Sequence, residues 1–336
     1  MGGCHHYADA CHGPAIVALG GGHGLSAVLR GMKHYTDRLT AIVTVADDGG
    51  GSGVLREDLG MPPPGDIRIC MEALADSESL MQSLLAYRFP DGRLAGQAFG
   101  NLLLAALDGM SDTFDQAVAR MSQVLAITGR ILPVTNAQVW LEATFDNGAS
   151  VRGESKIFAA KKEQDCRIHH VRLIPEQPPA LPQAVEAIRK ADVILLGPGS
   201  LYTSIIPNLL VDGIAEAIED SSAMKIYVGN IMTQEGETEG MTASDHLSAL
   251  LAHGGPRMVQ YYLCNSQPVH PHLVERYARE GAEPLVVDRS AVELLGAQVI
   301  GRPLLDQGAD YARHDGEKVA QAVLELYESL GATKIF

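Results

Sequence analysis

The sequence predicts an α/β protein with a doubly wound, mostly parallel sheet. Short apolar strands alternate with helical stretches along most of the chain. Two of these strands also stop at glycine-rich loops, residues 20–26 (GGGHGLS) and 197–204 (GPGSLYTS). A buried strand that ends in glycines and turns into a helix points backbone N–H groups and the positive end of the helix dipole at one spot. The two loops therefore predict a site for anionic oxygens.

The elements follow one another in the α/β manner. The expected strands are residues 15–19, 39–46, 166–173, 193–196, 225–228, 259–264 and 285–287. The expected helices are residues 25–32, 80–88, 100–107, 115–126, 182–190, 209–218, 243–252, 271–280 and 316–330, with a further helix starting at Ile67. The early helices predict a helical lobe over about 59–130. Asp-Asn-Gly at 146–148 predicts an antiparallel hairpin insertion at about 137–158.

No repeat or long linker divides the chain, so we expect a single domain over 15–336 that follows a disordered leader at 1–14. The leader holds soft metal ligands without a zinc-site spacing. These residues are Cys4, His5, His6, Cys11 and His12. A metal site and an incidental cluster are the two interpretations of the leader.

Charge and composition limit the partners. The formal net charge is −15 at pH 7, which leaves no general basic surface for nucleic acid. Five scattered cysteines are typical of a reducing compartment. Neither a signal peptide nor an apolar run long enough to span a membrane is present. We expect a cytoplasmic protein without membrane insertion, and a homo-oligomer is compatible with the sequence.

The first loop is a phosphate or nucleotide candidate, with a purely structural turn as the alternative. Its expected ligand-binding residues are Gly21, Gly22, His23 and Gly24. A dinucleotide fingerprint requires a third glycine where Leu25 stands, and no Gly-Lys-Ser/Thr follows as in a Walker A loop. Ser26 is placed to cap the following helix.

Two carboxylates, Asp47 and Asp48, follow the second strand and precede a glycine-rich segment that contains Ser52. Paired aspartates hold Mg²⁺ against phosphate oxygens in phosphoryl-transfer sites. An acid at this place instead holds ribose hydroxyls in nicotinamide enzymes. The third interpretation is a capped turn.

A rigid segment, Pro62-Pro63-Pro64-Gly65, carries Asp66 and Arg68. Such stiffness lowers the entropy lost when a ligand is ordered, so both residues are binding candidates. A surface proline corner with Asp66 as the helix cap is the alternative.

The second loop combines glycines with hydroxyls, which suits a diphosphate. Its candidates are Gly197, Gly199, Ser200, Tyr202 and Thr203, with Ser204 beside them. Asn230 opens a polar loop after another strand, facing the same crevice or forming an ordinary loop. Residues 313–315 are expected to cap the last helix, and Arg313 either clamps a phosphate or is solvated.

Together these segments resemble a known family. The carriers are GGGHGLS (20–26), VADDGGGSG (45–53), PPPGDIR (62–68), GNLLLAAL (100–107), LGPGSLYTSIIPNLL (196–210) and NIMTQEGET (230–238). They are similar to the YvcK family of gluconeogenesis factors, which resembles CofD, the 2-phospho-L-lactate transferase of deazaflavin-coenzyme biosynthesis.

The resemblance covers about residues 15–330 and implies a Rossmann-like CofD fold. It implies a role in cell shape and growth on gluconeogenic carbon, and binding of UDP-N-acetylglucosamine rather than turnover. The implied site draws on the first loop, Asn101 of GNLLLAAL, Tyr277 and Arg313. The sequence departs from many relatives at His23, where they carry Thr, and at Gly51, where they carry Ser.

Three functions follow from these observations. A regulatory protein would hold a nucleotide diphosphate sugar between the two loops, as opposite walls of one crevice. A metal-assisted transferase would use Asp47 and Asp48 to hold Mg²⁺ beside a nucleotide diphosphate. A nicotinamide-dependent dehydrogenase fits least, because the fingerprint fails at Leu25.

Overall fold

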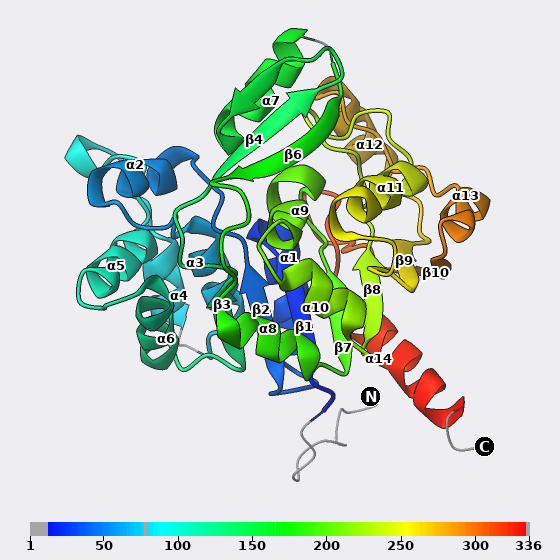
Figure 1. Cartoon of the computed structure of the whole chain (residues 1–336), viewed down its shortest axis with the longest axis horizontal. Helices are drawn as coiled ribbons and strands as arrows, with labels where there is room; N and C mark the ends of the chain where they lie inside the picture. The colour runs from blue at the N-terminus through cyan, green and yellow to red at the C-terminus, as the bar shows by residue number, and fades with distance from the viewer. Residues whose placement is uncertain (1–12, 77–78, 165, 334–336) are drawn as a thin grey trace.

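The computed structural model describes residues 13–76, 79–164 and 166–333, and Figure 1 shows their arrangement. The cysteine- and histidine-containing part of the leader lies outside the described residues. Most of the buried apolar side chains form one continuous core around the larger of two sheets.

The larger sheet has seven strands in the order β10-β9-β8-β7-β1-β2-β3, and every pairing in it is parallel. Its strands are β1 (Ile16–Gly20), β2 (Leu39–Val43), β3 (Arg130–Pro133), β7 (Val193–Leu196), β8 (Met224–Val228), β9 (Tyr261–Asn265) and β10 (Gln298–Arg302). All residues of β1, β2, β7 and β8 are buried, as expected for strands covered by helices on both faces. The order in which the strands are added reverses between β1 and β7, and open α/β sheets bind ligands at such a point. The predicted doubly wound parallel sheet is therefore confirmed.

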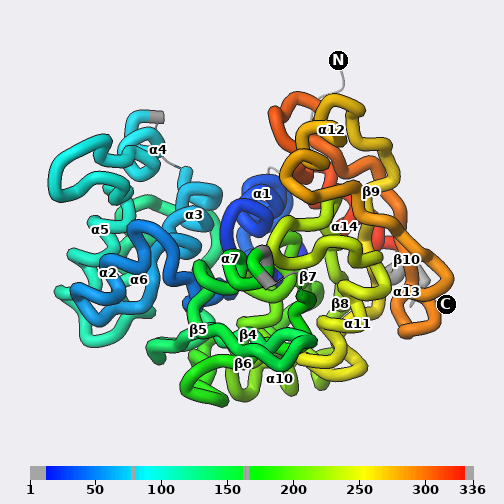
Figure 2. Tube along the Cα trace, turned by 90° about the horizontal axis from the view of Figure 1, so that it is seen from above, coloured from blue at the N-terminus to red at the C-terminus, as the bar shows by residue number. Residues whose placement is uncertain are grey.

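Helices cover both faces of this sheet. Behind it in Figure 1, α1 (Gly22–Met32) packs between α3 (Gly65–Leu74) and α14 (Gly316–Thr333). In front lie α8 (Pro182–Arg189) and α10 (Ile214–Asp220), and Figure 2 shows the two layers from above. Other helices lie toward the two edges of the sheet. On one side are α2 (Gly50–Leu59), α4 (Ser79–Ala86), α5 (Phe99–Asp108) and α6 (Phe114–Val124), and on the other α11 (Ala243–Gly254), α12 (Pro271–Arg279) and α13 (Arg289–Leu294).

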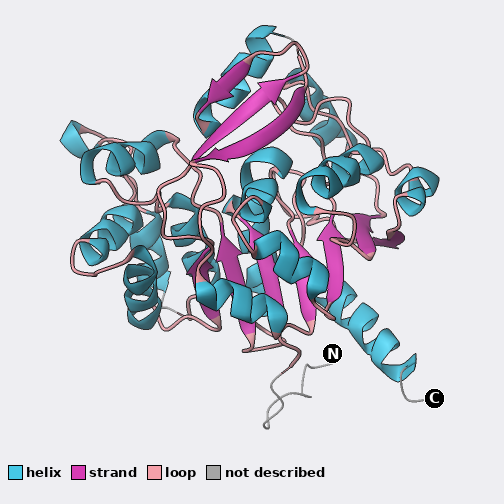
Figure 3. Ribbon diagram, viewed as in Figure 1, coloured by secondary structure: helices cyan, strands magenta, loops and turns pink. Residues whose placement is uncertain are grey.

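The second sheet is small and antiparallel, and it stands beyond the carboxyl ends of the main strands (Figure 3). It consists of β4 (Trp140–Phe145), β5 (Ser150–Arg152) and β6 (Ile168–Ile174), joined by α7 (Glu154–Gln164). The Asp-Asn-Gly turn does connect two antiparallel strands. The expected strand at 166–173, however, pairs antiparallel with β4 instead of joining the parallel sheet.

Several other predictions were wrong. Residues 285–287 form no strand, and β3 and β10 were missed. The helix expected at 209–218 is two helices, α9 (Ile206–Leu209) and α10, separated by Gly213 at φ +84°. The helix α2, which starts at Gly50 in the glycine-rich segment after Asp48, was also missed. Among the described helices, none combines the length and apolar character needed to cross a membrane.

Candidate functional site

The first glycine loop lies beside the point where the sheet order reverses, and α1 starts within it. Gly22 has φ +62°, a conformation that favours glycine, and Gly21 precedes the helix without a side-chain cap. The Ser26 hydroxyl donates to the carbonyl of His23 at 3.0 Å, so the prediction that it caps α1 was wrong. The first backbone N–H groups of α1 are therefore not capped by a side chain of the loop itself.

The two glycine loops touch each other. A Cβ atom on Gly24 would lie 2.5 Å from the carbonyl oxygen of Pro198 and 3.1 Å from the Cα of Gly199. Asn208 (buried, after the second loop) links them further, because its amide donates to Gly20 O at 3.2 Å and to Ser204 O at 2.8 Å. The loops are adjacent parts of one wall, which corrects the expectation of opposite walls.

Asn230 fixes the second loop. Its side-chain amide donates to Gly199 O at 2.9 Å and accepts the Gly199 N–H at 3.3 Å. The Ser200 hydroxyl donates to Gln234 Oε1 at 2.8 Å. The polar loop that Asn230 opens after β8 thus lies against the second glycine loop. Of its two interpretations, the one that placed it at the same crevice as that loop is the one that agrees with the structure.

Both loops line a cavity of about 390 Å³, called the loop cavity here. Of the predicted residues it brings together Gly21, Gly22, His23, Gly24, Gly199, Ser200, Asn230, Tyr277 and Arg313. Gly197, Tyr202 and Thr203 do not line it. Tyr202 is buried, and the backbone N–H groups of Tyr202 and Thr203 donate to Glu237 Oε1 at 2.7 and 3.0 Å.

Asp47 and Asp48 point to different partners. Asp47 accepts the Gly49 N–H at 2.8 Å, whereas Asp48 accepts the Ser155 N–H at 2.8 Å. Asp47, Ser52, Asp66, Arg68 and Asn101 line a second cavity of about 240 Å³, the aspartate cavity, which Asp48 does not line. In the described part of the chain no three His, Cys, Asp or Glu side chains are grouped to hold a metal ion. The two aspartates expected to share Mg²⁺ thus accept different backbone N–H groups, and only Asp47 lines the aspartate cavity.

Asp66 lies against the first loop. Its carboxylate accepts the Gly22 N–H and lies so close to Gly21 that no Cβ would fit there. Burial, together with the charges of Asp47 and Glu154, raises the pKa of Asp66 to about 7. Pro64, not Asp66, takes the N-cap position of α3, and no side chain caps that helix. The capping role predicted for Asp66 was therefore wrong.

Arg68 and Asn101 come together from two helices. Arg68 is buried and donates from Nε to Asn101 Oδ1 at 2.9 Å, while its Nη1 pairs with Glu72. A Cβ on Gly100 would lie 2.7 Å from Arg68 Cδ, so this glycine leaves room for the arginine.

Tyr277 and Arg313 also line the loop cavity. The backbone N–H of Ala312 holds the Tyr277 hydroxyl, and burial raises the pKa of Tyr277. Arg313 is exposed, with its guanidinium carbon 5.2 Å from the Tyr311 ring centroid. As predicted for residues 313–315, Asp315 accepts backbone N–H groups of the first turn of α14, from Glu317 at 3.1 Å and Lys318 at 3.3 Å.

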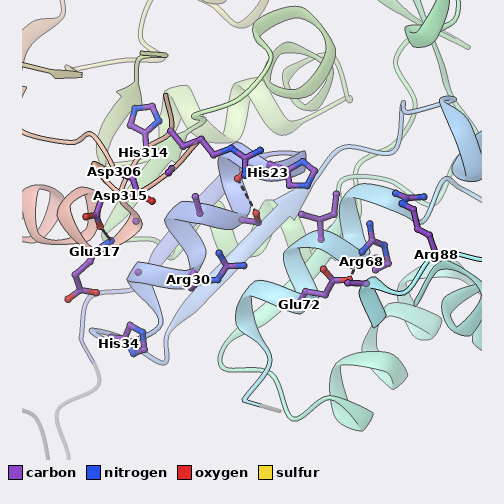
Figure 4. Close-up of a pocket in the computed structure, with 18 residues that line it drawn as sticks. His23, Arg30, His34, Arg68, Glu72, Arg88, Asp306, His314, Asp315 and Glu317 are labelled. Carbon is purple, nitrogen blue, oxygen red and sulfur yellow. Dashed lines mark hydrogen bonds and ion pairs between the residues drawn. The ribbon is translucent and has the colours of Figure 1, made fainter. Parts of the chain in front are cut away.

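A third and larger cavity, about 670 Å³, adjoins both others (Figure 4). We call it the arginine cavity, after Arg30, Arg68, Arg88 and Arg313 in its lining. His23 lies where it meets the loop cavity. Desolvation, then the charges of Arg313 and the other three arginines, lowers the pKa of His23 below its usual value. His23 is thus predominantly neutral at neutral pH.

Sequence reasoning missed several of these groups. Arg30 lies seven residues after His23, hence two turns along the same face of α1, and this spacing was a usable signal. Glu154 gave no comparable signal. Burial and the charges of Asp47 and Asp48 raise its pKa to about 7, although it is more than 100 residues away in sequence.

Known proteins are similar to this chain over most of its length. The profile of the family described as 2-phospho-L-lactate transferase CofD matches residues 16–305. The chain belongs to the CofD family. A relative from Thermoanaerobacterium thermosulfurigenes is 49% identical over 317 residues, which cover 94% of this chain and 98% of the relative. The gluconeogenesis factor of Bacillus subtilis is 45% identical over 314 residues, with 93% and 98% covered. Within the CofD family, the chain is a member of the gluconeogenesis factor (YvcK) branch.

A solved structure agrees with this family assignment. The crystal structure of a UPF0052 family protein from Bacillus halodurans superposes with a TM-score of 0.90 at 44% identity, covering 94% of this chain and all of that one. An added Cβ on Gly51 would lie 2.7 Å from Gln97 Oε1. That buried oxygen has no hydrogen-bond partner among the described residues.

Proposed function

We propose that this chain binds a nucleotide diphosphate sugar of the UDP-N-acetylglucosamine type in the loop cavity and acts as a regulatory protein. The observation that carries this proposal is the convergence of the α1 N-terminus, the second glycine loop and Arg313 on one cavity. Backbone N–H groups at a helix N-terminus bind phosphate oxygens, and an arginine adds a bidentate donor.

The lining suits a ligand with a charged centre and polar ends. Ser200, Ser204 and Asn230 add hydroxyl and amide groups beside the helix N-terminus. Tyr277 offers an aromatic face on the side of Arg313, where a base or sugar ring can pack. A diphosphate between these groups would place a nucleoside and a sugar on either side of the α1 N-terminus.

The relatives are named gluconeogenesis factors, and in this proposal the regulatory role concerns growth on gluconeogenic carbon sources. We extend this proposal to cell-shape control and to a cytoplasmic location. In this proposal, ligand binding rather than turnover is the signal, and a partner protein reads the occupied state.

A second candidate function is a CofD-like transferase that uses a nucleotide-diphosphate-activated donor of the 2-phospho-L-lactate type. One observation favours it. Asp66 and Glu154 both lie near Asp47, and both have a pKa raised to about 7. Carboxylates with a pKa near the working pH are suited to general acid and base catalysis.

Isothermal titration calorimetry of the full chain separates the two functions. The proposal predicts binding of UDP-N-acetylglucosamine without added metal, and loss of this binding in Arg313→Ala with an unchanged unliganded melting point. Arg279→Ala removes an exposed arginine from the same surface region and is the control. Binding of GDP only with Mg²⁺, and none of the uridine ligand, would favour the transferase.

A further inference from the structure

The arginine cavity has an excess of unpaired positive charge. Arg30 and Arg88 line this cavity but not the loop cavity, and Arg313 lines both. Across the described ranges, none of these three arginines forms an ion pair. Arg88 donates only to the carbonyl of Gly96, at 2.8 Å, among the hydrogen bonds of the described residues. In a chain of net charge −15, such a concentration of free guanidinium groups is unusual.

The acidic side chains of the same cavity are already engaged. Glu72 pairs with Arg68, and Glu317 accepts the Tyr35 hydroxyl. Asp315 caps α14, and Asp306 accepts the Gly308 N–H at 2.9 Å. These carboxylates retain oxygen lone pairs that can accept further hydrogen bonds, but they do not neutralise Arg30, Arg88 or Arg313.

The two kinds of side chain come from different elements. Figure 4 shows Arg68 and Arg88 on the α3 side, His23 and Arg30 on α1 in the middle, and Asp306, Asp315 and Glu317 on the opposite side. All four guanidinium groups act electrostatically on His23, so their charges converge near that residue. The cavity thus offers cations on α1 and on the α3 side, where Glu72 is paired with Arg68, and three further carboxylates on the opposite side.

We propose that the arginine cavity is a second ligand site, which binds a polyhydroxylated metabolite with two phosphate groups, of the sugar bisphosphate class, while the loop cavity holds its own ligand. The phosphates would lie between Arg30, Arg68 and Arg88, because guanidinium groups bind phosphate bidentately. The sugar hydroxyls would donate to the carboxylates of Asp306 and Glu317. A volume of about 670 Å³ is within the usual range of small-molecule sites.

The test is calorimetric titration of the full chain with fructose 1,6-bisphosphate. The neutral sugar fructose and the monophosphate glucose 6-phosphate serve as comparison probes. We expect the bisphosphate to bind, the monophosphate to bind about ten-fold more weakly and fructose not to bind, because each charged contact adds about this factor. Absence of bisphosphate binding overturns the proposal.

Single variants locate the site. Arg30→Gln and Arg88→Gln should each weaken bisphosphate binding about ten-fold, since each removes one charge-assisted contact. Arg189→Gln, which removes an exposed arginine on α8, should leave it unchanged. An equal effect of all three variants would show non-specific attraction and overturn the proposal.

A second titration separates this site from the loop cavity. UDP-N-acetylglucosamine binding should survive in Arg30→Gln and Arg88→Gln, and the bisphosphate should still bind to chain saturated with the nucleotide sugar. Direct competition between the two ligands would overturn the proposal. If no nucleotide sugar binds but the bisphosphate does, the proposed function fails while this second site stands.

Discussion

The carboxylate of Asp66 accepts the backbone N–H of Gly22 at the N-terminus of α1. The protein thereby places one of its own acids against the loop that is best suited to bind phosphate. The pKa of that carboxyl, about 7, means that its charge changes near neutral pH. Ligand binding at the first loop and the protonation of Asp66 are therefore expected to be coupled.

Asp66→Asn should change how stability depends on pH. The folded-state pKa of about 7 lies above the unfolded value of 3.8, so the contribution of Asp66 to stability is present below about pH 4 and is lost as pH rises through 7. Asparagine keeps the acceptor for Gly22 but cannot ionise. The unfolding free energy of the variant minus that of wild type should therefore rise by roughly 1 kcal/mol or more from pH 5 to pH 8. Urea denaturation at both values measures this, with exposed Asp58→Asn as the control. Parallel pH profiles for wild type and Asp66→Asn would contradict it.

Gly24→Ala should separate the two glycine loops. The added methyl group would lie 2.5 Å from Pro198 O, and backbone at this site has little room to move. We expect a loss of about 1–3 kcal/mol in unfolding free energy, together with weaker ligand binding in the loop cavity. Gly109→Ala is a matched control, because Gly109 has φ −61° and its nearest contact would be 3.7 Å away. A Gly24→Ala variant as stable as Gly109→Ala would show that the loops are not in contact.

Asn101→Ala should destabilise the protein by about 1–3 kcal/mol, since it leaves the buried Nε–H of Arg68 without its acceptor. Asn101→Asp keeps an oxygen at the same position and should recover most of the loss. Chemical denaturation of the three proteins at pH 8 gives the comparison. Equal losses in the two variants would mean that packing, rather than the hydrogen bond to Arg68, explains the effect.

Gly51→Ser should be tolerated, and it should stabilise the protein by about 0.5–1 kcal/mol. The serine hydroxyl would approach Gln97 Oε1, a buried oxygen without a partner among the described residues. The close contact is with the end of a flexible side chain, which can shift. Differential scanning calorimetry measures the change in melting temperature. A clear loss of stability in Gly51→Ser would contradict this expectation. If the double variant Gly51→Ser/Gln97→Ala, which shortens the side chain at position 97, then regains the stability, the cause is a steric conflict between the two side chains.

The local sequence pattern was enough to predict much of the fold and part of the candidate site. The apolar strands that end at Gly20 and Gly197 are buried parallel strands, as predicted, because continuous apolar runs are buried on both faces. The hairpin at residues 146–148 was also predictable, since its turn residues are neighbours in sequence.

The partner of a strand is not a local property. Residues 166–173 show strand-like alternation, but that pattern fits a parallel and an antiparallel sheet equally well, and the tertiary structure pairs them with β4. The contacts of a side chain are likewise not given by its neighbours in sequence. The adjacency of Asp47 and Asp48 suggested that they share a metal ion. In the tertiary structure their carboxylates accept the N–H groups of Gly49 and Ser155, which the adjacency did not predict.

The sequence by itself determined the class of fold, the family and the glycine loops of an anion site, because each depends on residues close together along the chain. Only the tertiary structure decided that the loops touch, that Asp66 lies against Gly22, and that four arginines meet near His23. Those relations join segments that are distant in sequence. Packing of helices against the sheet fixes them, and of these contacts only the seven-residue spacing of His23 and Arg30 on α1 can be read from the chain.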